Sequence, residues 1–452
     1  MQIEVPSKVS TIINTLTDNG FEAYAVGGCV RDSYLGLTPN DWDITTNALP
    51  AQVKELFRRT VDIGIEHGTV KVMMGNDGYE VTTYRIDGEY EDCRHPKNVT
   101  FTSKLEEDLK RRDFTINAMA YSERTGLVDL FGGIDDIEAG VIRAVGDPVE
   151  RFTEDALRIL RALRFSARFD YDIEAKTKEA IISLAPNLSN ISAERIRDEL
   201  EKLICSDNPD RLRWAYIFGV TSVIFPEWDD MMKCMQTTPH HYTDVGDHTI
   251  GVLEYIVTCY PDISKEDDRV LRLAALLHDI AKPACRFTGP DGIDHFTGHP
   301  AESEKMALFV MQRLKYDNDT INRVRKLVRY HDDTPEAAYP AVRRFIIAAG
   351  AENMENLIRL KYADIYAHTG YRRAEKLRMA GELDKMYRKV LSDGDCLSVK
   401  QLAVNGHDLM ACGIKDGPKI GEALNFLLEK VLDDPGVNEK DTLLKELGAR
   451  MG

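Results

Sequence analysis

The chain changes character near residue 150, and this change constrains its fold more than any other feature. Short β-rich runs separated by turn residues fill residues 1–146, for example at 23–26, 69–73 and 79–84. From Thr153 to the end, Ala, Leu, Arg and Glu recur at helical spacing, and strand signals nearly vanish. The sequence therefore predicts an α+β fold, in which a small mixed-sheet head is followed by an all-α neck and body.

At 452 residues the chain is too long for one hydrophobic core. We expect an opening helix at 7–19, and a helix that begins at Thr153 as N-cap with Glu154 and Asp155 in its first turn. A further helical segment should open near Asn405. Breaks in the pattern predict a head at 1–146, a neck at 147–210, a connector at 211–235, a larger helical unit at 236–395 and a helical tail at 396–452.

The composition is that of an ordinary soluble protein, with 43% hydrophobic and 29% charged residues. No apolar run reaches membrane-spanning length and no secretory signal opens the chain, so we expect a cytoplasmic protein that does not bind membranes. The eight cysteines form no CxxC pair and are expected to be reduced. The sequence carries no signal for oligomeric state.

A net charge of −17 argues against wholesale wrapping of nucleic acid. One strip is nevertheless basic: residues 158–168 hold four arginines and no acid. Their spacing of three, three and four places them on one helical face, which is typical either of a local RNA contact or of a solvated face offset by acids elsewhere. The four are Arg158, Arg161, Arg164 and Arg168.

Two carboxylates one residue apart, Asp41 and Asp43, are the first candidate for chemistry. If 41–44 is a strand, both lie on one face, while Trp42 and Ile44 point into a core on the other. Such a pair can bridge two Mg²⁺ ions, as phosphoryl transfer requires. Taken alone, the pattern is equally typical of a surface turn at a strand end.

Four other segments support the same pocket. The Gly27-Gly28 turn lets backbone N–H groups approach phosphate oxygens, and Arg31 can add a charged contact. A polar loop at 84–96 can cover a substrate. In 110–118, Arg111 and Arg112 can reach triphosphate oxygens, and Asp113 can accept a hydrogen bond from a ribose hydroxyl. The fourth segment is 66–70, a glycine-containing turn that enters a strand.

Asp155 and Arg158, three residues apart on the expected helix, suggest a reading of base identity. Cytosine and adenine each offer an amino donor beside a ring acceptor, which an Asp/Arg pair complements. Uracil and guanine reverse that order and would leave a buried group unpaired. The alternative is an ordinary surface salt bridge between the two side chains.

The motifs GGxVRD, DWDI, RRDFTINA, RHP and DPVERFTEDALRILRALRF, together with 191–196, resemble the class II tRNA nucleotidyltransferase family over residues 20–205. This family contains CCA-adding enzymes and bacterial poly(A) polymerases. The resemblance implies metal ligation and catalysis by Asp41 and Asp43. It further implies triphosphate contacts at the glycines and Arg31, ribose selection at Arg112 and Asp113, and base selection at 154–158. The full candidate nucleotide-binding set is Gly27, Gly28, Arg31, Arg111, Arg112, Asp113, Asn117, Glu154, Asp155, Arg158, Arg161 and Arg164. Glu80 is either a third carboxylate of the pocket or a structural acid.

A second set of residues lies in the helical half. His278-Asp279 ends an apolar helix, with His248 upstream and Asp364 downstream, and these four groups can converge on one divalent metal. His299 and His331 add further imidazoles as auxiliary candidates. The ordered series resembles an HD-domain phosphohydrolase site. HD domains attached to CCA-adding enzymes resemble 2′,3′-cyclic phosphodiesterases, phosphatases and 2′-nucleotidases, which implies Mg²⁺, Mn²⁺ or Ni²⁺ here. The alternative is a relic fold without catalysis.

The function that fits best is CCA addition: a nucleotidyltransferase using Mg²⁺, CTP and ATP that builds the tRNA 3′ end, with the acceptor arm along the neck arginines and the tail at the elbow. A poly(A) polymerase is the first alternative, although 62–69 lacks the basic Gly-Arg-Arg-Phe type segment usual in that group. An A-adding specialist also stays open, whereas the undeleted loop at 85–96 argues against a CC-only enzyme. The alternative of another class is an HD phosphohydrolase with an RNA-binding head.

Overall fold

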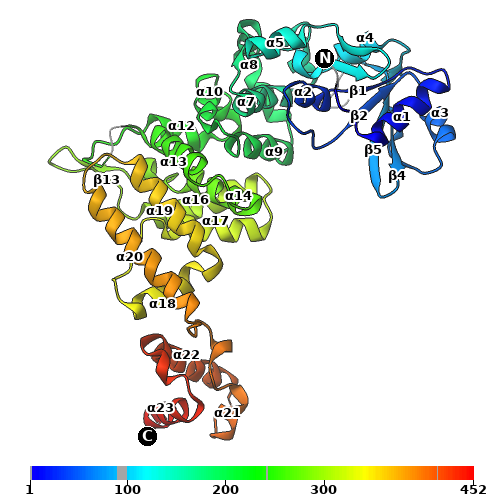
Figure 1. Ribbon diagram of the computed structural model, residues 1–452. Helices are drawn as coiled ribbons and strands as arrows, with labels where there is room; N and C mark the ends of the chain where they lie inside the picture. Colours follow the sequence, from blue (N-terminus) through cyan, green and yellow to red (C-terminus); the bar gives the residue numbers. More distant parts are fainter. Residues whose placement is uncertain (1–2, 89–98, 241–242, 415, 452) are drawn as a thin grey trace. The chain divides into compact units, whose positions relative to one another are not determined.

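The computed structural model describes residues 3–88, 99–240, 243–414 and 416–451. The chain forms two compact units, Met1–Pro226 and Glu227–Gly452 (Figure 1). The first unit contains the sheet and the neck helices, and the second is almost wholly helical. The expected α+β order is therefore confirmed, while the finer division at 146, 210, 235 and 395 stays a prediction.

A seven-stranded mixed sheet forms the centre of the head, in the order β3-β4-β5-β2-β1-β8-β9. The central strand β2 pairs parallel to β5 and antiparallel to β1. The strand predicted at 23–26 matches β1. The strands predicted at 69–73 and 79–84 lie within one or two residues of the bounds of β4 and β5. The strands are β1 Ala23–Val26, β2 Asp43–Thr46, β3 Thr60–Gly64, β4 Thr69–Met74, β5 Asp77–Thr83, β8 Met119–Ser122 and β9 Gly126–Asp129.

Short helices pack on this sheet. The expected opening helix is α1 (Ser7–Asp18), which buries Val9, Ile12, Ile13 and Leu16 at helical spacing. The others in the head are α2 Gly28–Tyr34, α3 Pro50–Leu56, α4 Leu105–Lys110 and α5 Gly133–Ala139. A small hairpin, β6 Arg85–Asp87 with β7 Val99–Phe101, flanks 89–98, so most of the polar loop predicted at 84–96 lies outside the described residues.

Two local predictions were wrong. The strand begins at Asp43 rather than Asp41, and Trp42 is only half-buried, whereas Ile44 is fully buried. Thr153 is not an N-cap, because it lies inside α6 (Pro148–Glu154), whose N-cap Asp147 accepts a hydrogen bond from the Val149 N–H. The Asp-Pro pair at 147–148 is the stronger start signal, since proline is well suited to the first helical turn.

The neck follows directly from the head. A parallel two-strand pairing of β10 (Val141–Ile142) with β11 (Asp172–Ile173) joins the two. The neck helices are α6, α7 Leu157–Phe169, α8 Ala175–Leu184, α9 Ala193–Ile204, α10 Leu212–Ile217 and α11 Thr221–Ile224. The helix α7 buries its apolar side chains and carries all four arginines of the basic strip.

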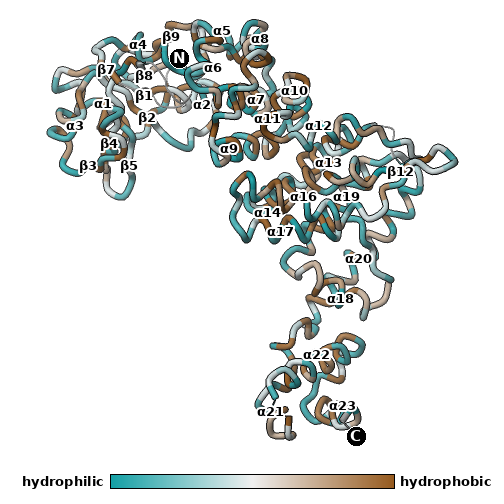
Figure 2. Tube along the Cα trace, turned by 180° about the vertical axis from the view of Figure 1, so that it is seen from behind, coloured by the Kyte–Doolittle hydropathy of each residue, from teal (hydrophilic) through white to brown (hydrophobic). Residues whose placement is uncertain are grey.

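The second unit is a helical body followed by a tail with its own core. Hydrophobic and hydrophilic stretches alternate along its helices, as expected for amphipathic packing (Figure 2). The body helices are α12 Pro226–Lys233, α13 Val245–Cys259, α14 Lys265–Leu277, α15 Lys282–Cys285, α16 His299–Arg313, α17 Asn318–Tyr330, α18 Tyr339–Ala349, α19 Met354–Ala367 and α20 Arg373–Ser392, with one two-strand pairing, β12 Phe287–Thr288 and β13 Asp294–His295. The tail helices are α21 Gly406–Ala411, α22 Gly417–Asp433 and α23 Lys440–Met451.

Asn405 opens the tail as expected, because its side chain accepts hydrogen bonds from the N–H groups of His407 and Asp408. Seven cysteines lie in the described part of the chain, and all of them are free thiols. Within the same residues, no helix is both long and apolar enough to cross a membrane.

Candidate functional site

The head pocket is built around Asp43, the first residue of the central strand β2. Asp43 lies opposite Glu80 of β5 in the parallel register. It is exposed, but the surrounding protein removes part of its hydration, and this loss, with the nearby charges of Glu80 and Asp41, raises its pKa despite the opposing charge of Arg112. Glu80 also pairs with Lys71 at 3.6 Å. Carboxylates that repel one another in this way are suited to hold a divalent cation.

A close backbone approach places Arg112 beside this pocket. Gly27 has φ +82°, and a Cβ added there would lie 2.9 Å from Arg112 Nη1. The positive φ favours glycine at this position, and a larger residue would also displace the Arg112 guanidinium. Arg112 Nη2 contacts Asp108 at 3.4 Å. The predicted glycine turn and the predicted arginine are thus neighbours in space.

Arg31 lies deeper than a triphosphate contact needs to. Its guanidinium is 3% exposed, donates to Asp32 at 2.6 and 2.8 Å and to Asn117, and lies over the rings of Phe165 and Phe169. Burial lowers its pKa. The contacts hold α2 against the neck helix α7, so the triphosphate role of Arg31 stays a prediction.

Asp113 connects the head to the neck. Its Oδ1 accepts hydrogen bonds from Asn117 Nδ2 at 3.0 Å and from the Phe114 N–H at 2.9 Å, while Oδ2 accepts from Arg161 Nε at 2.8 Å. Burial opposes its ionisation, but Arg161, Asn117 and Arg158 outweigh that effect and hold the pKa of Asp113 well below its usual range. Ribose recognition by Asp113 stays a prediction.

The base-reading pair differs from its expected geometry. Asp155 lies in a break between α6 and α7, not within one helix. Its Oδ1 accepts from the Leu157 N–H at 3.0 Å and its Oδ2 from Arg195 at 2.7 Å. Arg158 donates to Glu154 at 2.7 Å and to the backbone carbonyl of Arg111 at 2.9 Å. The two side chains are thus held by separate partners, and the alternative of a simple surface salt bridge between them does not apply.

The basic strip on α7 is matched by carboxylates along its length. Arg158 pairs with Glu154, Arg161 with Asp113, Arg164 with Glu199 and Arg168 with Asp32, at 2.6 to 2.9 Å. Three of these acids lie outside α7 and α6, in the head and in α9. The strip therefore forms ion pairs that hold α7 to the head and to its neighbouring helices, while the side chains of Arg161 and Arg168 keep about a third of their surface exposed.

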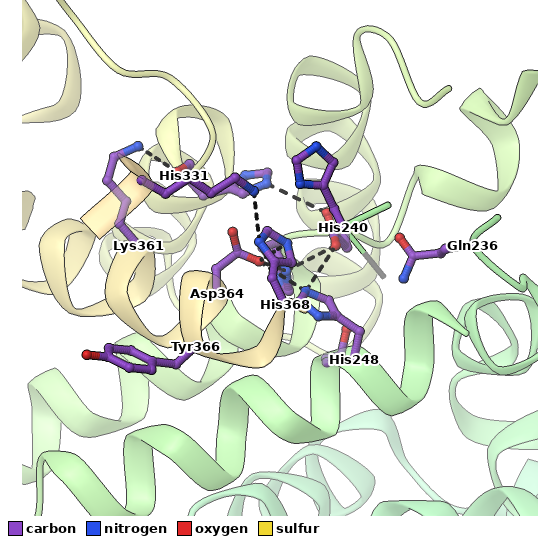
Figure 3. A network of polar contacts seen from close by, with 12 residues as sticks. Gln236, His240, His248, His331, Lys361, Asp364, Tyr366 and His368 are labelled. Atoms are coloured by element: carbon purple, nitrogen blue, oxygen red, sulfur yellow. Dashed lines mark hydrogen bonds and ion pairs between the residues drawn. The ribbon is translucent and has the colours of Figure 1, made fainter. Parts of the chain in front are cut away.

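The second unit brings together all six residues predicted for its metal site. His278 and Asp279 follow α14, and His299 opens α16. His248 comes from α13, His331 ends α17 and Asp364 lies on α19, and these three are labelled in Figure 3. Asp279 faces two imidazole groups: its Oδ2 lies 3.1 Å from His278 Nε2, and its Oδ1 lies 3.2 Å from His299 Nε2. His248 Nε2 lies 3.0 Å from Asp364 Oδ1. These side chains form overlapping groups with ligand atoms within 4.8 Å of one another.

The tautomers of three imidazoles follow from their backbone contacts. Nδ1 of His278, His299 and His331 lies 2.7 to 2.9 Å from the carbonyl oxygens of Ala275, Phe296 and Val328. Because a carbonyl only accepts, each Nδ1 carries a proton, and in the neutral ring each Nε2 then directs a lone pair toward the centre. His299 Nε2 and His331 Nε2 are 3.3 Å apart, so in the neutral rings two lone pairs face each other. A cation between them removes this repulsion, and the donor set therefore fits a divalent metal.

His368 is the residue that the sequence analysis missed. It ends α19 one turn after Asp364, and its Nε2 lies 3.3 Å from Asp364 Oδ1. Its Nδ1 lies 3.0 Å from Lys376 Nζ, which as an ammonium only donates. The Nε2 of His368 consequently carries the proton and donates to Asp364, which orients this carboxylate instead of ligating. The spacing of four on a helix was the available signal.

Neighbouring polar groups keep both carboxylates ionised. Burial opposes ionisation, but His278 and Lys282 hold the pKa of Asp279, and His368 and His248 that of Asp364, well below their usual range. Lys282 Nζ contacts Asp279 Oδ2 at 2.7 Å. The cluster lines two adjoining cavities of about 310 and 710 Å³.

Three family models match the chain. They are the poly A polymerase head domain at 23–143, the probable RNA and SrmB-binding site of polymerase A at 170–232, and tRNA nucleotidyltransferase domain 2 at 299–447. A CCA-adding enzyme from Pediococcus pentosaceus is 34% identical over 441 residues, which are 96% of this chain and 95% of that relative. The chain belongs to the CCA-adding enzyme family.

Other relatives agree with this assignment. A CCA-adding enzyme from Leuconostoc mesenteroides is 57% identical over 193 residues, which span 43% of this chain and 48% of the relative, about half its length. The crystal structure of the Bacillus stearothermophilus CCA-adding enzyme in complex with CTP is 27% identical, covers 99% of both chains and has a TM-score of 0.73. The fold and the side-chain clusters of the chain indicate the use of divalent metal.

Proposed function

We propose that the chain adds C, C and A to the 3′ end of tRNA from CTP and ATP without a nucleic-acid template. The observation that carries this proposal is a continuous set of contacts in the first unit. The charge of Arg112 acts on Asp43, and the next residue, Asp113, accepts a hydrogen bond from Arg161 on α7; the same helix carries Arg158, which donates to the Arg111 carbonyl. A carboxylate centre and a base-reading centre on one framework are what a polymerase without a template requires.

We propose Mg²⁺ at Asp41 and Asp43. The fit rests on the position of Asp43 opposite Glu80 in the parallel register; loss of hydration, together with the charges of Glu80 and Asp41, raises the pKa of Asp43, and a cation would offset both effects. When bound, such ions help to ionise the attacking 3′-hydroxyl and neutralise the leaving pyrophosphate. Arg112, held open to the pocket by Gly27, is placed to bind triphosphate oxygens.

Base selection falls to Asp155 and Arg158, whose existing partners leave them spare bonding capacity. A carboxylate has about four acceptor positions, and Asp155 uses one on each oxygen. The amino group of cytosine or adenine can donate to a remaining position, and an unused Arg158 N–H can donate to the ring nitrogen. Glu154 keeps the Arg158 guanidinium in place at 2.7 Å.

For the RNA, we propose that the acceptor arm lies along the exposed parts of Arg161 and Arg168 and that the tail at 396–452 reaches the elbow. The family matches described as RNA binding and as tRNA nucleotidyltransferase domain 2 fall on these two halves of the chain. Confined contacts of this kind are compatible with a net charge of −17. We also propose a cytoplasmic location, because tRNA, CTP and ATP are found there.

The test uses tRNA that lacks its 3′ end. The purified chain is incubated with each labelled nucleotide singly and then with CTP and ATP together, and the product is sequenced. We expect two C residues followed by one A. Long A tails would replace the CCA assignment with poly(A) polymerase, and addition of A only to tRNA ending in CC would identify an A-adding specialist.

We propose a second activity, hydrolysis of 2′,3′-cyclic or 2′ phosphates at the histidine cluster with Mg²⁺, Mn²⁺ or Ni²⁺. The favouring observation is the convergence of imidazole lone pairs from His278, His299 and His331 beside two ionised carboxylates. When bound there, the metal polarises the phosphate and lowers the pKa of a bound water. A His278→Ala variant should lose tightly bound metal and hydrolysis of 2′,3′-cyclic CMP while keeping nucleotide incorporation. The exposed His407 provides the control, since His407→Ala should change neither. Hydrolysis that survives in His278→Ala would refute this second assignment.

A further inference from the structure

We propose that Lys376 anchors the phosphate of a single nucleotide in the 310 Å³ cavity beside the histidine cluster. This inference deepens the proposed phosphohydrolase activity and rests on it. It assigns a ligand class, a nucleotide with a terminal phosphate, and one residue that binds it.

The cavity is lined by ionic side chains, among them His331, Asp364 and Lys376, and by an apolar wall of Ile365, Met379 and Ala380. Ligand pockets for small molecules range from roughly 300 to 1,000 Å³, so this volume suits one nucleoside rather than a folded RNA. The phosphate then contacts Lys376, and the nucleoside contacts the apolar wall.

Lys376 differs from the other cations that line this cavity. Arg372 is neutralised by Glu375 through two contacts of 2.6 Å. Lys361 donates to the backbone carbonyls of His331 at 2.7 Å and of Asp333 at 2.5 Å. For Lys376, no ion pair with a carboxylate is found among the residues that the structure describes, and its one polar contact there is His368 Nδ1 at 3.0 Å.

The bond to His368 fixes the Lys376 ammonium and leaves two of its three N–H donors for a ligand. Figure 3 shows His368 and Asp364 side by side at the centre of the cluster, so this ammonium lies one imidazole away from the metal-facing carboxylate. Burial lowers the pKa of Lys376, as expected for a cation that lacks a counter-ion. A phosphate that bridges the metal cluster and Lys376 would supply that counter-ion.

The apolar wall favours no particular base. Met379 is half-exposed at 38%, and a flexible thioether adapts to either ring size. The site should therefore accept nucleotides of cytosine and adenine with similar affinity, unlike the base-reading centre in the first unit.

The test measures binding of inorganic phosphate and of 3′-CMP to the metal-loaded full chain by calorimetry. Lys376→Met should weaken phosphate binding about 10- to 150-fold, the range for one charged hydrogen bond, when the variant and the wild type are compared at equal measured metal content; nucleotide incorporation in the first unit should not change. Lys376→Arg should retain most of the affinity. Lys389→Met is the control, because Lys389 lies on the same helix but pairs with Asp393 at the surface. Met379→Ser should weaken 3′-CMP but not inorganic phosphate.

Unchanged phosphate affinity in Lys376→Met, or an equal loss in Lys389→Met, would overturn the anchor. If Met379→Ser bound 3′-CMP with the same affinity as the wild type, the placement of the nucleoside would be wrong. The two proposals fail separately. If phosphate binding depends on Lys376 but the wild type hydrolyses nothing, the phosphohydrolase activity is refuted and the anchor stands. If the wild type hydrolyses its substrate and Lys376→Met does so equally well, the anchor is refuted and the activity stands.

Discussion

Replacing Asp155 with asparagine tests the base-reading centre most sharply. The substitution keeps the size of the side chain and an oxygen that can accept from the Leu157 N–H at 3.0 Å. It removes the charge that pairs with Arg195 at 2.7 Å. It also turns one acceptor into a donor, so the new side chain can serve the carbonyl of uracil where the carboxylate can serve only an amino group.

The magnitude follows from the bonds involved. In the wild type, the amino group of cytosine donates to a free acceptor position on the Asp155 carboxylate. The amide NH₂ of asparagine cannot accept this bond, so a buried polar group is left unpaired, at a cost of about 1–3 kcal/mol. This corresponds to a loss of about 5- to 160-fold in the preference for CTP over UTP, expressed as the ratio of kcat/KM values. Stability should fall much less, because the hydrogen bond from the Leu157 N–H at the start of α7 is retained.

The assay is single-nucleotide incorporation into tRNA lacking its 3′ end, with CTP and UTP measured separately. Arg195→Met is the matched control, since it removes the ion pair but leaves the carboxylate. We expect the control to lower the unfolding temperature and to keep the preference for CTP. If Asp155→Asn kept the preference for CTP over UTP while Arg195→Met lost it, the ion pair and not the carboxylate would be reading the base.

Three further outcomes are expected. Asp43→Ala should abolish incorporation while circular dichroism and the unfolding temperature stay close to the wild type, because Asp43 is exposed at the end of a strand; residual incorporation near wild-type rates would exclude it as a metal ligand. The low pKa of Asp113 in the folded state stabilises the first unit at neutral pH, and this stabilisation should be lost as the pH falls from about 4 toward the folded-state pKa. The free energy of unfolding, measured with denaturant, should therefore fall less steeply with decreasing pH in Asp113→Asn than in the wild type. Chelation of metal should lower the unfolding temperature of the second unit, because the Nε2 atoms of His299 and His331 then face each other at 3.3 Å without a cation; an unchanged melting curve would argue against bound metal.

The sequence was most informative where structure depends on near neighbours. The opening helix and the strand at 23–26 lie within one residue of their predicted bounds, because alternation and helical spacing are set by residues a few positions apart. The break at Asp155 escaped prediction for the opposite reason. Its carboxylate is held by Arg195, 40 residues away, and this contact does not exist until α9 packs against α7.

The sequence by itself determined the order of sheet and helices, the motif residues of the head, and the six metal-site candidates of the helical half. Only the tertiary structure decided how their charges are used. It showed that Arg31 is buried over two aromatic rings, that the arginines of α7 are each paired with a carboxylate, and that His368 orients Asp364 from a proton position set by Lys376. These roles depend on which partner each ionisable group meets, and that choice is made by long-range packing rather than by local pattern.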